Sequence, residues 1–87
     1  IKIHMSSNLL RSEISQIKKM IQQEEIQKAI ERMDKISKSE FNPKFSSEEI
    51  SEMKDNLELA IVFSYLECFE GTVEALNKIK DVVEKKN

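Results

Sequence analysis

The sequence predicts an all-α protein built as an antiparallel bundle of long amphipathic helices. The 87 residues include one Gly and one Pro, so few residues interrupt a helix. Hydrophobic residues make up 39% of the chain and charged residues 34%, and good helix formers dominate both groups. The apolar residues also recur at spacings of three and four, which places them on one side of a helix.

The first helix is expected over about residues 7–38, a stretch without Gly or Pro, with Ser6, Ser7 and Asn8 as candidate N-caps. Its two halves carry apolar stripes on roughly opposite faces: Leu10, Ile14, Ile17 and Ile21, then Ile26, Ala29, Ile30, Met33 and Ile36. Two interpretations fit this change of face, a turn near residues 22–25 or one long helix that buries different faces at its two ends. Because residues 22–25 are all good helix formers, we favour the unbroken helix.

The clearest interruption of the chain lies around Pro43. Pro disfavours helical conformation at the residue before it, and Ser46 followed by Glu49 matches the capping-box pattern. A second helix is therefore expected to start at about Ser47 and to run over about residues 47–86. The two Phe residues that flank the proline are expected to plug the end of the core, with an exposed aromatic pair as the alternative: Phe41 and Phe45.

The middle of the second helix carries an unusually broad apolar surface, spanning roughly 220° of its circumference. A helix this apolar must contact at least two other helices, either from its own chain or from a second copy. Gly71 interrupts the pattern, so the helix is expected to be kinked or broken there. If both long helices are otherwise continuous, the chain is a two-helix hairpin that forms a homodimer, in coiled-coil fashion, to complete a four-helix bundle. If both break, the chain closes its own bundle.

The two halves of the chain resemble each other at an offset of about 47 residues, as in helical repeats. The stretch AIVFSYLECFEGTVEALNKI (60–79) resembles a tetratricopeptide-type unit, with an aromatic-rich helix, a Gly turn and an Ala-containing second helix. IQKAI (26–30) echoes only the second half of that unit. The period is longer than in that family, and the step from Gly to Ala is one residue shorter. The resemblance implies a scaffold that binds peptides or proteins, not a catalyst.

Few residues are suited to catalysis or to metal binding. Cys68 is the only thiol and His4 the only imidazole, so no nucleophile stands beside a base in the sequence and no metal-ligand spacing occurs. Cys68 lies in the most apolar stretch, where we expect it to pack as a small hydrophobe, with a reactive thiol as the alternative. We therefore expect no enzyme activity, no catalytic or metal site and no cofactor.

The charge is distributed unevenly along the chain. Residues 46–70 carry seven acidic residues and one lysine, which gives −6, whereas the whole chain has a net charge of −2. We expect either an acidic helix beside more basic neighbours or a surface that recognises a basic partner, and the candidate acidic surface is Glu48, Glu52 and Asp55. The candidate face for a partner or for self-association is Leu59, Val62, Phe63, Tyr65, Leu66, Phe69 and Val73.

The sequence thus indicates a small protein–protein interaction module or adaptor. A stand-alone regulator that masks one protein target, such as an immunity, antitoxin or chaperone-like protein, is the alternative, and a nucleic-acid binder is disfavoured by the mild acidity. Residues 6–87 are expected to form a single domain, with residues 1–5 as a non-native leader or disordered tail. We expect no membrane segment and a cytoplasmic location.

Overall fold

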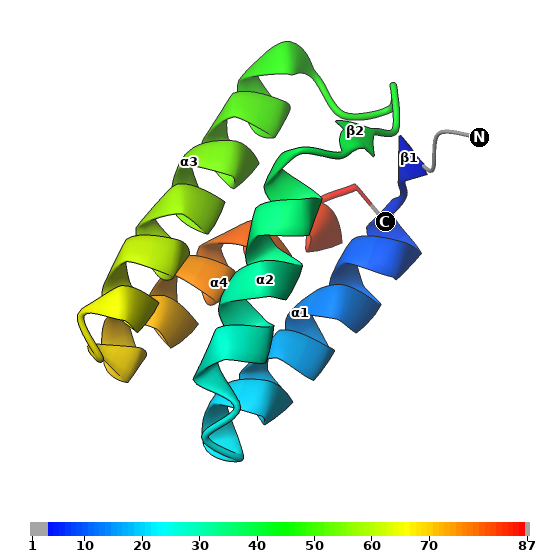
Figure 1. Ribbon diagram of the computed structural model, residues 1–87. Helices are drawn as coiled ribbons and strands as arrows, with labels where there is room; N and C mark the ends of the chain where they lie inside the picture. Colours follow the sequence, from blue (N-terminus) through cyan, green and yellow to red (C-terminus); the bar gives the residue numbers. More distant parts are fainter. Residues whose placement is uncertain (1–3, 87) are drawn as a thin grey trace.

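The computed structural model describes residues 4–86, which form four helices and a pair of very short strands (Figure 1). In chain order the elements are β1 (His4–Met5), α1 (Ser7–Gln22), α2 (Ile26–Ser37), β2 (Glu40–Phe41), α3 (Ser47–Tyr65) and α4 (Phe69–Glu84). The all-α fold class is confirmed, with helices packed on helices. The expected unbroken helix over 7–38 is wrong, because it divides into α1 and α2, and the expected helix over 47–86 divides into α3 and α4. Within the described residues, no helix has the length and apolar content needed to cross a membrane.

Both long helices are divided by a tight turn in which a glutamate adopts the left-handed conformation. Glu24 has φ 63° and Glu67 has φ 58°, and each follows the last residues of a helix as in a Schellman motif. The backbone hydrogen bonds that close the two turns run from Glu25 to Met20 and from Cys68 to Phe63, both at 2.8 Å. A left-handed non-Gly residue costs about 1–2 kcal/mol, so another contribution must stabilise each turn.

Burial supplies that contribution in the first hairpin. The apolar stripe changes face after Ile21, so a straight helix would bury only one of its two halves. Folding back at the turn places both stripes in one core: Leu10, Ile14, Ile17 and Ile21 from α1, and Ala29, Ile30, Met33 and Ile36 from α2 are all buried. Burying one large aliphatic side chain stabilises the fold by about 1.5–3 kcal/mol, so the second stripe outweighs the cost of the turn.

The second long helix breaks at residues 66–68, and the expected kink or break at Gly71 is therefore wrong. Gly71 lies within the first turn of α4, where its missing side chain permits close packing. A Cβ atom at this position would lie 2.8 Å from Cγ of Phe63, whose ring comes from α3. Because both long helices break, one chain supplies four helices, and the two-helix hairpin that a homodimer would complete does not form.

The two hairpins are structural repeats of each other. Their left-handed glutamates, Glu24 and Glu67, lie 43 residues apart, which corrects the offset of about 47 residues read from sequence. Buried positions follow the same offset: Leu10 and Met53, Ile14 and Leu57, Ile17 and Ala60, Met33 and Leu76, Ile36 and Ile79. Near the second turn the equivalent buried positions are polar. Ser64 and Thr72 take the places of Ile21 and Ala29, and their hydroxyl oxygens lie 3.1 Å apart.

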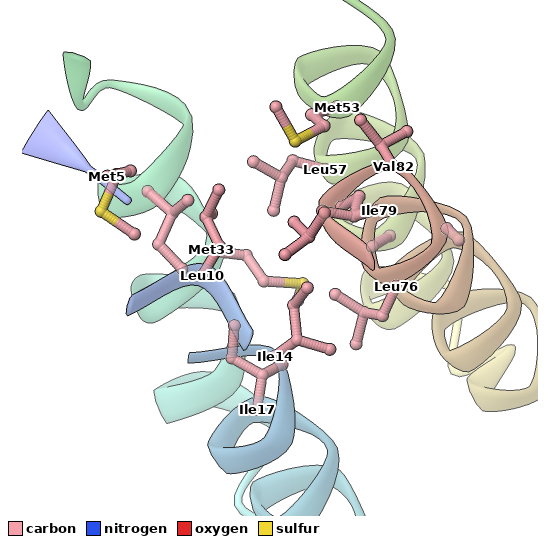
Figure 2. Packing of buried hydrophobic residues seen from close by; sticks show 14 of the residues in the cluster. Met5, Leu10, Ile14, Ile17, Met33, Met53, Leu57, Leu76, Ile79 and Val82 are labelled. Carbon is pink, nitrogen blue, oxygen red and sulfur yellow. The ribbon is translucent and has the colours of Figure 1, made fainter. Parts of the chain in front are cut away.

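The core lies where the two hairpins meet. Helices α1 and α3 each pack against both α2 and α4, which confirms that α3 contacts two other helices. Side chains from all four helices point toward one another there (Figure 2). Phe41 and Phe45 are buried with ring centroids 6.5 Å apart, so the expected aromatic plug is confirmed.

The short strands tie the start of the chain to the segment after α2. β1 pairs in parallel with β2, and the side chain of Met5 is only 5% exposed. His4 Nε2 lies 3.4 Å from a carboxylate oxygen of Glu40. The expected tail over residues 1–5 is therefore corrected for His4 and Met5, which belong to the fold, while residues 1–3 lie outside the described residues.

Candidate functional site

Six exposed side chains follow one another along the outer face of α3. We call this set the α3 seam: Glu48, Glu52, Asp55, Leu59, Val62 and Leu66, the last being the residue that caps the helix. They succeed one another at alternating spacings of four and three residues, which keeps them on one face of the helix. The same spacing defines the positions through which helices of a coiled coil pack against each other.

The position of the α3 seam follows from the way α3 packs in the bundle. Its opposite face is buried against α2 and α4 through Met53, Leu57, Ala60 and Ser64. Capping fixes the start of the helix, because the hydroxyl of Ser46 accepts the N–H of Glu49 at 3.1 Å and the Glu49 carboxylate accepts the N–H of Ser46 at 2.8 Å. The predicted start at Ser47 is confirmed. The α3 seam thus lies on the outside of the four-helix bundle.

The C-terminal half of the α3 seam is apolar although it faces solvent. Leu59 is 47% exposed, Val62 51% and Leu66 70%, and the neighbouring Tyr65 is 65% exposed. Outward faces of bundle helices normally carry polar residues. A group of large apolar side chains left in solvent and bordered by polar residues is typical of an interaction site.

The N-terminal half of the α3 seam is acidic. Glu48, Glu52 and Asp55 line an open hollow of about 570 Å³ that ends at Leu59. In the part of the chain that the structure describes, none of these three carboxylates forms an ion pair, although six ion pairs occur elsewhere. Their negative charge is therefore not neutralised by a neighbouring lysine or arginine.

Glu49 shows by contrast how an acid of the same turn is neutralised. Its carboxylate lies 2.9 Å from Nζ of Lys86 near the end of α4. The hydrogen bond from the Ser46 N–H, reinforced by Lys86, holds the pKa of Glu49 below its ordinary value. Glu49 thus belongs to the fold, whereas the α3 seam acids beside it point into solvent.

The structure divides the seven residues of the predicted partner face among three places. Leu59, Val62 and Leu66 lie on the α3 seam with Tyr65 on its flank, while Phe63 packs over Gly71. The remaining two residues, Phe69 and Val73, line a separate hollow of about 560 Å³ between α1 and α4. Ile21 also lines this hollow, and the acidic side chains of Glu70 and Glu74 border it. The seven residues therefore do not form one surface.

The α3 seam itself was not recognised in the sequence, although all six of its residues were named as candidates. The acidic and apolar sets were treated as two separate surfaces. The signal that joins them is their shared spacing, which the dense apolar pattern between Leu57 and Phe69 conceals. Only the packing of α3 shows which part of that broad apolar arc is left outside.

The lone thiol and the lone imidazole lie at opposite ends of the bundle. Cys68 is exposed at the turn before α4, so the expectation that it packs in the core is wrong. Tyr65, near the end of α3, is exposed as well. His4 lies in β1, at the opposite end of the bundle from the turn between α3 and α4 (Figure 1). Across residues 4–86, no group of three or more His, Cys, Asp or Glu is arranged to hold a metal ion.

Comparisons with protein-family models, with curated proteins and with solved structures find no match to this chain. The resemblance to a tetratricopeptide-type unit thus gains no support, and the turn that it places at Gly71 lies at residues 66–68.

Proposed function

We propose that this protein is a protein–protein interaction module that binds one helix of its partner along the α3 seam and has no catalytic activity of its own. The observation that carries the proposal is the row of exposed apolar residues at coiled-coil spacing on a helix whose other face is already buried. Because the four helices of one chain close the core, these side chains do not complete the packing of the chain itself.

The dimensions of the α3 seam suit a helical ligand. Between Glu48 and Leu66 the helix rises about 27 Å, which is long enough to contact five turns of a second helix. An amphipathic helix that lays its apolar face on such a surface uses anchors at spacings of three and four residues. The same spacing separates Leu59, Val62 and Leu66.

A selection experiment tests this proposal without knowledge of the natural partner. Helical peptides of about 21 residues, with Leu at alternating spacings of three and four and other positions randomised over Lys, Glu, Gln and Ala, are selected for binding to the folded protein. Binders are then measured against Leu59→Asp/Leu66→Asp, which places charge on the apolar half of the α3 seam. Affinity should fall at least about tenfold, since a desolvated carboxylate on an apolar contact is costly.

The matched control is Asn8→Asp/Ser15→Asp on α1. It adds the same two charges at the same seven-residue spacing, at exposed positions on another helix, and should leave the affinity unchanged. If the two double variants weaken binding equally, or if neither does, the selected peptides do not use the α3 seam and the proposal is refuted.

A further inference from the structure

Resting on this proposed function, we infer that the partner helix is bipartite: cationic where it meets Glu48, Glu52 and Asp55, and apolar where it meets Leu59, Val62 and Leu66. The α3 seam changes from acidic to apolar at one point, between Asp55 and Leu59. A uniformly amphipathic helix would set apolar side chains against three carboxylates. Lysine or arginine opposite that half would instead form ion pairs while the other half buries its hydrocarbon.

No cation of the described chain forms an ion pair with a carboxylate of the acidic half. Lys54, the only basic residue between positions 46 and 70, points to the other side of α3, with Nζ 5.6 Å from the ring centroid of Phe41. Glu58 is exposed one turn beyond Asp55 and adds negative charge beside the α3 seam. The field on this face is therefore negative, which attracts a cationic segment and repels nucleic acid phosphates.

A second copy of the chain is a poor occupant, because the α3 seam is not self-complementary. Two parallel copies of α3 would place each carboxylate against its own equivalent. Two antiparallel copies in full register would place Glu48 against Leu66, and so bury carboxylates against hydrocarbon, which is costly. Shifting the antiparallel pair to match Leu59 with Leu66 would bring Asp55 to the turn of the other copy, where Glu67 and Glu70 lie.

Charge reversal on the α3 seam tests the inferred partner chemistry. The same peptide library is selected in parallel against the wild-type protein and against Glu48→Lys/Glu52→Lys/Asp55→Lys, at exposed positions where the change leaves the core untouched. Wild type should enrich peptides with Lys clustered at one end, and the reversed variant should enrich peptides with Glu at that end. The best cationic peptide should bind wild type about tenfold more tightly than Glu48→Gln/Glu52→Gln/Asp55→Asn, as three exposed ion pairs imply.

Salt and oligomeric state complete the test. Affinity for the cationic peptide should fall as salt rises from about 50 mM to about 500 mM, because salt screens exposed ion pairs. In a separate measurement, analytical ultracentrifugation should show that the wild-type protein is a monomer. If peptides lose binding to Leu59→Asp/Leu66→Asp but carry no charge preference, the cationic partner is refuted while the proposed function stands. If no peptide depends on Leu59 and Leu66, both are refuted. A wild-type dimer that Leu59→Asp/Leu66→Asp dissociates would make a second copy the occupant and overturn the inference.

Discussion

Substitution of Gly71 by alanine should destabilise the protein, although replacing a glycine inside a helix by alanine usually increases stability. Alanine is favoured over glycine in a helix by about 1 kcal/mol. The added methyl group would, however, lie 2.8, 2.9 and 3.0 Å from three ring carbons of Phe63. Contacts this close at the base of a ring force the ring or the helix to move, and overpacking of this kind costs about 1–3 kcal/mol. The net effect should be a loss of about 1 kcal/mol in the free energy of unfolding.

A double-mutant cycle separates the two contributions. In a Phe63→Ala background the methyl group enters space that the ring has left, so Gly71→Ala should stabilise by about 1 kcal/mol. The two substitutions are then coupled by about 2 kcal/mol. Urea unfolding of the four proteins, followed by far-UV circular dichroism, measures this coupling. Equal stabilisation by Gly71→Ala in both backgrounds would refute the argument that the ring of Phe63 requires glycine at this position.

Three further predictions concern the core and the start of α3. Leu57 is 1% exposed, so Leu57→Ala should lower the free energy of unfolding by about 2–5 kcal/mol. Leu66 is 70% exposed, so Leu66→Ala should lower it by less than about 1 kcal/mol. Equal losses in urea titrations would place Leu66 in the core. Ser46→Ala should cost about 1 kcal/mol by loss of the N-cap, and an unchanged urea midpoint would contradict the capping box. Because the pKa of Glu49 is held below its ordinary value of 4.5, its stabilising contribution is complete above that value and is lost as the pH falls through the lowered pKa. The stability difference between wild type and Glu49→Gln should therefore shrink in unfolding titrations taken from about pH 7 to about pH 3, and a constant difference would contradict this.

The helical content and the corner around Pro43 were predictable because local signals agree there. Ser46 and Glu49 form the capping box that their spacing indicates, and Phe41 and Phe45 are buried on either side of the proline. Each of these features depends on residues close in sequence. Local sequence patterns are therefore enough to predict them.

The two hairpin turns were not predictable from propensity, because glutamate occupies the left-handed position in both. Glycine is the usual residue there, so Gly71 drew the predicted break away from Glu67. What fixes the turns is burial across the whole chain, since each turn lets two apolar stripes share one core. The stabilisation comes from tertiary packing, so the helix propensities of residues 22–25 and 66–68 do not indicate the turns.

The candidate site was predictable in its members and not in its arrangement. Every residue of the α3 seam was named from the charge distribution or from the apolar pattern of the second helix, yet Phe63, Phe69 and Val73 were grouped with it. A helix that is apolar around most of its circumference does not reveal which residues its neighbours cover. The positions of α2 and α4 decide that Leu57 is inside and that Leu59 is outside.

The central claim is that the outer face of α3 is the binding surface, and amide chemical-shift mapping tests it most directly. Protein labelled with nitrogen-15 is titrated with the selected cationic helical peptide at low salt. The account predicts shift changes along α3 from Glu48 to Leu66, with the exposed faces of α1 and α2 unaffected. Changes centred on α1 and α2, or on the separate hollow at Phe69 and Val73, would contradict it.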